Sequence, residues 1–279
     1  MKKPSLKELE YTAAQCRRKV LRMIEAGKSG HMGGALSCID IVTALYFYAM
    51  NVDPKNPHMP GRDRFILSAG HKCMAQYAVL AHKGFFDEKV LDTYGSLNTH
   101  LPGHPDMYKL PGVEANTGAL GHGLSLGLGM ALGLRMDGKP AKTYIVMGDG
   151  ELTEGSNWEA AAAAAQYKAD NLLVFVDRNG LQISGKTAEI MDMNPAARFA
   201  AFGWAVKEID GNNMKEITDA LDAAPFAPGK PSLILAHTVK ARGISFAEGV
   251  ASSHYWKPAK EELQKAIAEV DAKIKEASL

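Results

Sequence analysis

The sequence contains little of what marks a secreted protein. It has three cysteines in 279 residues, with no C-x-x-C pair, at Cys16, Cys38 and Cys73. This odd, sparse usage argues against a disulfide scaffold and indicates a reducing compartment. The first residues, MKKPSLKELEY, carry lysines but lack the apolar segment of a signal peptide. We therefore expect a soluble protein of the cytoplasm.

Neither a charge excess nor a convincing membrane span is present. Lys and Arg number 32 against 31 Asp and Glu, so the net charge of +1 gives no field that would attract nucleic acid or a membrane surface. The longest apolar stretch, ALSCIDIVTALYFYAM, includes Asp40 and is too short to cross a bilayer comfortably. Aromatic residues make up only 8% of the chain, which favours closely packed helices over a β-sandwich. Nucleic acid and membrane partners are not expected.

What the chain does contain is an alternation of helical and strand patterns. Continuously apolar strands are predicted at 65–68, 142–147, 171–176 and within 230–239. Helices are predicted at 6–26, 36–50, 124–136, 214–224 and 259–279. Two more are predicted, one that begins near residue 72 and one within 197–206. Buried strands between helices are typical of a parallel sheet covered on both faces. We predict one α/β domain over residues 1–279, a parallel β-sheet sandwiched between helices, with 259–279 as an exposed C-terminal helix.

An acidic turn follows the second of these strands. The segment MGDGELTEGSNWEA carries four acids, Asp149, Glu151, Glu154 and Glu159. Such crowded carboxylates repel one another unless solvent, a lysine or a metal ion compensates their charge. Ser156, with Glu159 three residues later, also predicts a capping box that opens the next helix. The turn is therefore a candidate cation site.

The spacing between this turn and the next strand end points to a metal and a diphosphate. Asn179 follows the strand after Asp149, at the distance of one strand–helix–strand unit, so both side chains reach the rim where parallel sheets bind ligands. Mg²⁺ prefers such oxygen ligands and is usually completed by phosphates, while Gly148 and Gly150 let the backbone approach a diphosphate. A lone GDG could equally be a solvated turn, but the pairing of GDG with DRNG favours the Mg²⁺-diphosphate interpretation. No G-x-G-x-x-G or Walker pattern is present.

The helix predicted at 124–136 contains more glycine than a helix tolerates without a reason. Gly123 and Gly127 share one face, and Gly129 and Gly133 share another. Each costs about 1 kcal/mol relative to alanine. Such glycines make sense where another element approaches closely, and we expect a subunit contact along SLGLGMALG.

These motifs together resemble one known family. GDGELTEGSNWEAAAAA followed by VDRNGLQISG is similar to the thiamine diphosphate motif of transketolases. Further segments resemble the same family in the same order, covering roughly Thr12 to Pro258: KSGHMGGALS, ILSAGHKCMAQYAVL, LPGHPD, TGALGHGLSLGLGMALG and TVKARGISFAEGVASSHYWKP. The resemblance implies thiamine diphosphate and Mg²⁺ as cofactors, with Ca²⁺ or Mn²⁺ as substitutes, in a parallel sheet between helices.

The resemblance also implies roles for individual residues. Metal ligands are Asp149, Asn179 and the backbone carbonyl of Leu181. Gly150 and Glu154 line the diphosphate turn, and the aminopyrimidine touches Gly118, Ala119 and Leu120. Lys240 occupies a matching basic position. Among the histidines, His31 and His104 face the sugar substrate, and His71 and His254 lie near the diphosphate, where imidazoles can shuttle protons near neutral pH.

Histidines can also bind zinc or have purely structural roles. A zinc site between His100 and His104 is disfavoured, because the enclosed LPG cannot keep both on one helix face. Structural roles are expected for the remaining five, His58, His82, His100, His122 and His237. The chain also departs from the family, because Met32 follows the first histidine where transketolases usually have proline, and the family pattern therefore does not define the geometry at His31.

A second departure concerns chain organisation. Transketolases continue into a pyrimidine-binding domain that supplies the cofactor-activating glutamate, and Glu151, Glu154 and Glu159 lie beside the diphosphate turn and cannot replace it. We therefore expect the N-terminal subunit of a split transketolase, which transfers a two-carbon ketol unit between sugar phosphates of pentose phosphate metabolism. Its partner would be a C-terminal subunit with the pyrimidine domain, in an α₂β₂ heterotetramer.

Two alternative functions compete with this expectation. One is an alpha-type subunit of another thiamine diphosphate enzyme, either a 2-oxo acid dehydrogenase or a deoxyxylulose-phosphate synthase, against which the histidine set and ELTEGSNWEA argue. The other is a non-catalytic cofactor-binding scaffold. A scaffold need not keep Asp149, Asn179 and the histidines, so the enzyme is favoured.

Overall fold

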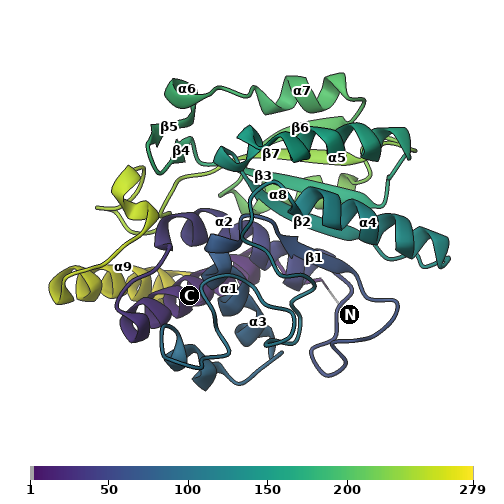
Figure 1. Cartoon of the computed structure of the whole chain (residues 1–279). Helices are drawn as coiled ribbons and strands as arrows, with labels where there is room; N and C mark the ends of the chain where they lie inside the picture. Colours follow the sequence, from purple (N-terminus) through teal and green to yellow (C-terminus); the bar gives the residue numbers. More distant parts are fainter. Residues whose placement is uncertain (1–2, 279) are drawn as a thin grey trace.

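A five-stranded parallel sheet forms the centre of the structure (Figure 1). The computed structural model describes residues 3–278, and the strand order is β1-β2-β3-β7-β6, each neighbouring pair being parallel. The strands are β1 (Arg64–Leu67), β2 (Thr143–Gly148), β3 (Leu172–Arg178), β6 (Ala205–Asp210) and β7 (Ser232–His237). The predicted parallel α/β sheet is confirmed, and its C-terminal strand ends share one edge.

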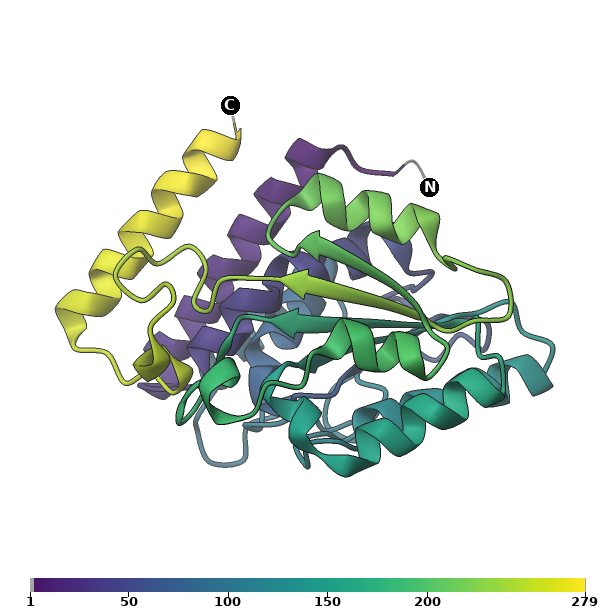
Figure 2. The ribbon, with the colours of Figure 1, turned by 90° about the horizontal axis from the view of Figure 1, so that it is seen from above.

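Helices cover both faces of the sheet (Figure 2). Alternate strand residues enter two cores: Tyr144 and Val146 face one side, while Ile145 and Met147 face the other. The first core is closed by α1 (Leu6–Gly27), α2 (Met32–Ala44), α3 (Cys73–Lys83) and α8 (Met214–Ala223). The second is closed by α4 (Gly123–Met136), α5 (Gly155–Gln166) and α7 (Pro195–Ala201). This double burial explains the continuously apolar strands.

Helix α2 begins at Met32, four residues before the predicted start, and continues as a short π-helix, η1 (Leu45–Ala49). Within the described part of the chain, Met32–Ala49 is the one helical stretch with the length and hydropathy of a membrane span, and it is 83% buried. Its apolar surface is already covered by the first core, so its hydropathy is accounted for by burial.

Strand β6 was not predicted, and the expected helix in ARFAAFGWAV covers only its first half. Helix α7 ends near Gly203, whose φ of +98° suits glycine, and the chain then pairs with β7 at the edge of the sheet. The sequence of β6, AVKEID, is only partly buried and has no long apolar run, which is why the sequence did not indicate a strand there. A small hairpin, β4 (Leu181–Gln182) with β5 (Gly185–Lys186), followed by α6 (Thr187–Ile190), was also missed.

The predicted capping box of Ser156 and Glu159 is wrong. Helix α5 has Glu154 as its N-cap residue, without a side-chain cap hydrogen bond. The Ser156 hydroxyl instead donates to the carbonyl of Gly121 at 2.9 Å, because this loop lies against the helix start. A contact between residues 35 positions apart has therefore taken the place of the predicted local capping box.

The C-terminal helix, α9 (Lys260–Ser278), lies against α1. Ala266 and Val270 are buried there, and Arg18 of α1 pairs with Asp271. The exposure expected for this helix therefore holds only for its outer face.

Helix α4 presents its two glycine pairs to different surroundings. A Cβ at Gly127 would overlap the Ile145 side chain of β2, and one at Gly123 would overlap Ser68. At Gly129 and Gly133 an added Cβ would meet nothing within 4 Å. The first pair lets the helix pack on the sheet, whereas the predicted subunit contact of the second pair stays a prediction.

Candidate active site

A cavity of about 320 Å³ opens at the C-terminal edge of the sheet. Ten of the thirteen site residues predicted from the sequence line it: His31, His71, Gly118, Leu120, Asp149, Gly150, Asn179, Leu181, Lys240 and His254. They come from segments far apart in the chain that follow β1, β2, β3 and β7 or precede α2 and α4. The parallel topology therefore collects them at one place, while their individual roles stay predictions.

Asp149 and Asn179 stand at the ends of adjacent strands. Asp149 directly follows β2 and Asn179 directly follows β3, and these strands pair in register up to Gly148 and Asp177. The Asp149 carboxylate accepts the amide of Gly150 at 2.9 Å and that of Gly180 at 2.7 Å. These two bonds fix the carboxylate at the cavity wall, as the βαβ argument predicted.

The donor set fits a hard cation bound together with a diphosphate. Within residues 3–278 no cluster of three or more His, Cys, Asp or Glu could hold a metal ion. A metal would therefore need the oxygens of Asp149, Asn179 and the Leu181 carbonyl plus oxygens from its ligand, the usual arrangement for Mg²⁺. Burial raises the pKa of Asp149 to about 6, and the positive charge of nearby Lys72 offsets only part of this effect.

Glu151 belongs to the same acidic turn but has a structural environment. It is 2% exposed and accepts the amides of Gly121 at 2.9 Å and Gly148 at 3.1 Å, together with the hydroxyl of Ser68. Burial raises its pKa, and these donors partly offset that effect. Its carboxylate thus joins the ends of β1 and β2 to the loop before α4 and holds the turn in shape.

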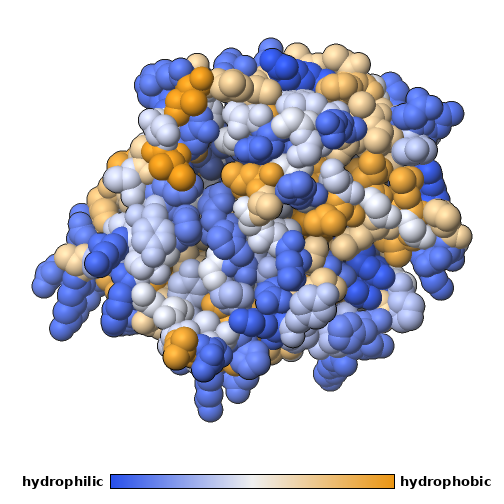
Figure 3. All heavy atoms as spheres, in the orientation of Figure 1, coloured by the Kyte–Doolittle hydropathy of each residue, from blue (hydrophilic) through white to orange (hydrophobic). Residues whose placement is uncertain are grey.

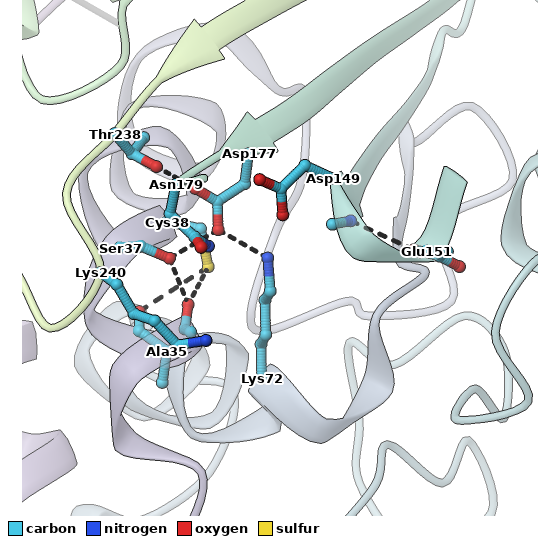
Figure 4. Close-up of polar contacts among 12 residues, drawn as sticks. Ala35, Ser37, Cys38, Lys72, Asp149, Glu151, Asp177, Asn179, Thr238 and Lys240 are labelled. Atoms are coloured by element: carbon cyan, nitrogen blue, oxygen red, sulfur yellow. Dashed lines mark hydrogen bonds and ion pairs between the residues drawn. The ribbon is translucent and has the colours of Figure 1, made fainter. Parts of the chain in front are cut away.

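Sequence reasoning missed a buried ion pair beneath the cavity (Figure 4). Lys72 donates to Asp177 at 2.6 Å, and the two side chains are 3% and 0% exposed. Asp177 also accepts the hydroxyls of Ser37, at 2.6 Å, and Thr238. Burial alone would lower the pKa of Lys72, but the Asp177 carboxylate outweighs it and holds the pKa above its ordinary value. The sequence feature that could have indicated this ion pair is Asp177, an acidic residue at the end of an apolar strand and two residues before Asn179.

Three of the predicted histidines form one cluster. The ring centroids of His31, His71 and His254 lie 5.2 to 5.3 Å apart in each pairing. Burial and then Lys72 lower the pKa of His71 to about 2, and burial and then Lys240 lower that of His254 to about 4. Burial also lowers the pKa of His31. The rings of His71 and His254 are therefore neutral near pH 7 and available as hydrogen-bonding groups.

Met32, the departure from the family pattern, shapes the backbone at His31. His31 has φ −78° and ψ 66°, the conformation of an inverse γ-turn, and the Met32 amide donates to the Gly30 carbonyl at 2.8 Å. Proline has no amide hydrogen and could not close this turn. The His31 ring nevertheless reaches the cavity.

Lys240 links the metal-ligand side of the cavity to the histidine cluster. Its ammonium donates to the Leu181 carbonyl at 3.2 Å and lies 3.2 Å from Nδ1 of His254. Burial and then the charge of Lys72 lower its pKa to about 8. Two lysines therefore concentrate positive charge at the strand ends.

The other predicted site residues lie outside the cavity lining. His104 is exposed and packs beside Gly118, where an added Cβ would meet its ring at 2.7 Å. Glu154 caps α5 beside Gly121, and Ala119 is exposed between two lining residues. His104 is thus placed at the rim, and Glu154 and Ala119 make no contact that assigns them a role. The five histidines expected to be structural do not line the cavity.

Comparison with known families matches residues 10–269 to "Transketolase, thiamine diphosphate binding domain". One subunit of the apulose-4-phosphate transketolase of Phocaeicola vulgatus is 45% identical over 267 residues, covering 95% of each chain. The 6-deoxy-6-sulfo-D-fructose transketolase subunit SqwG of a Clostridium species is 44% identical, covering 95% of this chain and 96% of the relative.

A solved structure extends the likeness to the fold. Transketolase from Campylobacter jejuni superposes with a TM-score of 0.88 and 33% identity, covering 94% of this chain but 42% of its own. The chain therefore spans less than half of that transketolase and nearly all of the relatives named as subunits.

Proposed function

The chain belongs to the transketolase family, and on that premise we propose that it is the cofactor-diphosphate subunit of a split transketolase. With a partner that carries the pyrimidine-binding domain, in an α₂β₂ heterotetramer of the cytoplasm, it transfers a two-carbon ketol unit from a ketose phosphate to an aldose. Relatives of the same length that are each named as one subunit of a transketolase support the two-chain organisation. Their names suggest a test panel of substrates that begins with apulose 4-phosphate and 6-deoxy-6-sulfo-D-fructose.

One observation carries this proposal: Asp149 and Asn179 stand at the ends of adjacent strands on a cavity that Lys240 and three histidines also line. Asp149, Asn179 and the Leu181 carbonyl would hold Mg²⁺. Thiamine diphosphate, when bound, supplies the carbanion chemistry of ketol transfer. The neutral His71 and His254 would accept or donate hydrogen bonds at the diphosphate end.

The substrate end of the cavity belongs to His31 and His104. His31 lines the cavity and His104 lies at its rim, so both can exchange protons with sugar hydroxyls that enter from outside. The Tyr255 ring packs on His31, and the Tyr255 hydroxyl shares a hydrogen bond of 2.8 Å with Ser29. These contacts orient the His31 ring for its proposed role.

The partner chain would cover the surface next to the cavity. Apolar side chains are exposed on the hairpin and on α6 and the residue after it, at Ile183, Ile190 and Met191, and Ile183 also lines the cavity. Hydrophobic atoms are visible in this upper-left region of Figure 3, where Figure 1 places β4, β5 and α6. A partner seated there would complete the pocket and remove these side chains from water.

Calorimetry on Asp149→Ala tests the cofactor assignment. The variant should lose most of its affinity for Mg²⁺ with thiamine diphosphate, because an anionic metal ligand is gone. Asp137→Ala, which changes an exposed residue after α4, is the matched control and should bind like wild type. Unchanged affinity in Asp149→Ala would refute the metal-ligand role.

A further inference from the structure

Lys72 is built into the floor of the cavity by two glycines. Its stem packs where a Cβ of Gly34 would lie, with Lys72 Cγ at 3.0 Å and Cε at 3.1 Å from that position. Its ammonium lies 3.3 Å from the position that a Cβ of Gly148 would take. Side chains at either position would displace the lysine, so α2 and the end of β2 together leave a channel for it.

The ammonium has hydrogen-bonding capacity beyond its ion pair. An ammonium carries three donors, and among the hydrogen bonds of residues 3–278 one uses Lys72 Nζ, the bond to Asp177. Asp177 is held in turn by Ser37 and Thr238, so the ammonium is anchored from one side. Lys72 also lines the cavity, beside Gly148, Asp149 and Gly150.

The local charges favour an anion once a divalent cation is bound. Asp149 and Glu151 on this cavity wall, with Asp177 beneath it, outnumber Lys72 and Lys240 by one. A divalent cation added at Asp149 leaves this wall positive, which suits a diphosphate. The Gly148–Gly150 turn brings that wall within reach of a phosphate, because a glycine lets the chain approach a ligand closely.

We propose that Lys72 is a diphosphate-binding residue, whose ammonium, anchored by Asp177, contributes a fixed positive charge to the cofactor site in addition to the metal. The inference rests on the proposed function for the identity of the cofactor. It assigns Asp177 as a positioning residue that acts through Lys72. It also predicts that the remaining donors of the Lys72 ammonium give the site measurable affinity for a diphosphate without a divalent cation.

The test compares binding of inorganic pyrophosphate and of thiamine diphosphate by calorimetry, in Mg²⁺ and in EDTA. Wild type should bind pyrophosphate in EDTA, and Lys72→Met should weaken this binding by about 10- to 100-fold, the range for a charge-assisted hydrogen bond. Arg17→Met is the matched control. Arg17 forms a largely buried ion pair with Asp40 outside the cavity, so its loss costs stability but leaves pyrophosphate affinity unchanged.

Lys72→Met leaves Asp177 buried without its cation and can unfold the chain, so a second pair of variants isolates the ligand contact. Asp177→Asn and the double variant Lys72→Met with Asp177→Asn both remove the unpaired carboxylate. The double variant should bind pyrophosphate about 10- to 100-fold more weakly than Asp177→Asn alone. Equal affinity of these two variants would show that Lys72 only neutralises Asp177.

Two further outcomes separate the inference from the proposed function. If wild type binds thiamine diphosphate in Mg²⁺ but shows no pyrophosphate binding in EDTA, the role of Lys72 is wrong and the proposed function stands. If wild type binds neither ligand under any condition, the proposed cofactor site itself is wrong.

Discussion

At the scale of single residues, two carboxylates two positions apart in the acidic turn have different surroundings. Asp149 faces the cavity, where we propose that it binds a metal, whereas Glu151 is enclosed by donors from three segments. A glutamate can accept all of these donors at once because both of its oxygens are acceptors. The difference between ligand and scaffold lies in what surrounds each side chain.

We expect Glu151→Gln to destabilise the chain. The new side-chain NH₂ would oppose either the Gly148 amide or the Gly121 amide together with the Ser68 hydroxyl, so at least one buried donor would lose its acceptor. The cost should be about 1–3 kcal/mol in the free energy of unfolding, measured by urea denaturation. Glu159→Gln is the exposed control, and since no capping box forms there, it should leave stability unchanged.

His71 predicts part of the pH dependence of stability. Its folded pKa of about 2, lowered by burial and by Lys72, lies below the unfolded value of 6.5, so the unfolded chain binds the proton first as pH falls. Between pH 7.5 and 5.5 this group should therefore remove about 1 kcal/mol of stability.

The measurement is urea denaturation of wild type and His71→Gln at both pH values. The variant should lose about 1 kcal/mol less than wild type over this interval. His58→Gln, at an exposed position away from the cavity, should follow wild type. A variant that loses as much stability as wild type would contradict a neutral, buried His71.

At the scale of elements, the glycines of α4 differ in their surroundings: Gly127 packs against the sheet, and Gly129 faces open space. Gly127 lets the helix reach β2, so Gly127→Ala should destabilise the chain by overlap with Ile145. Gly129 is exposed and has open space at its Cβ, so Gly129→Ala should stabilise the isolated chain by about 1 kcal/mol.

If a subunit packs on this face, the same Gly129→Ala change should weaken association. Urea denaturation of the isolated chain and sedimentation with the partner chain would measure the two effects separately. Gain of stability without weaker association would remove the Gly129 face from the subunit contact. The helix would then need another explanation for its exposed glycines.

At the scale of the whole molecule, we expect the chain alone to have no ketol-transfer activity. Glu151, Glu154 and Glu159 all lie in or beside the turn after β2, at the diphosphate side of the proposed site. Of the three, Glu151 alone lines the cavity, and its carboxylate is already held by the Gly121, Gly148 and Ser68 donors. Adding a pyrimidine-domain partner with Mg²⁺ and thiamine diphosphate should produce activity in a coupled assay, and robust turnover without it would overturn the split-enzyme proposal.

Much of this protein follows from sequence by itself. Apolar strands, the GDG and DRNG turns and the spacing between them are local patterns, and they determined the parallel sheet and placed Asp149 and Asn179 at its rim. These predictions held because strand periodicity and turn chemistry act over a few residues, while one topological rule brings neighbouring strand ends together.

Only the tertiary structure decided which other groups meet there. Lys72 and Asp177 are 105 positions apart, and Glu151 reaches a hydroxyl 83 positions away, so no local pattern signals either contact. Edge strand β6 and the hydrogen bond of Ser156 to Gly121 likewise depend on neighbours brought by folding. Burial strengthens the charge and hydrogen-bonding preferences of these groups, and burial is a property of the packed molecule, not of the residue order.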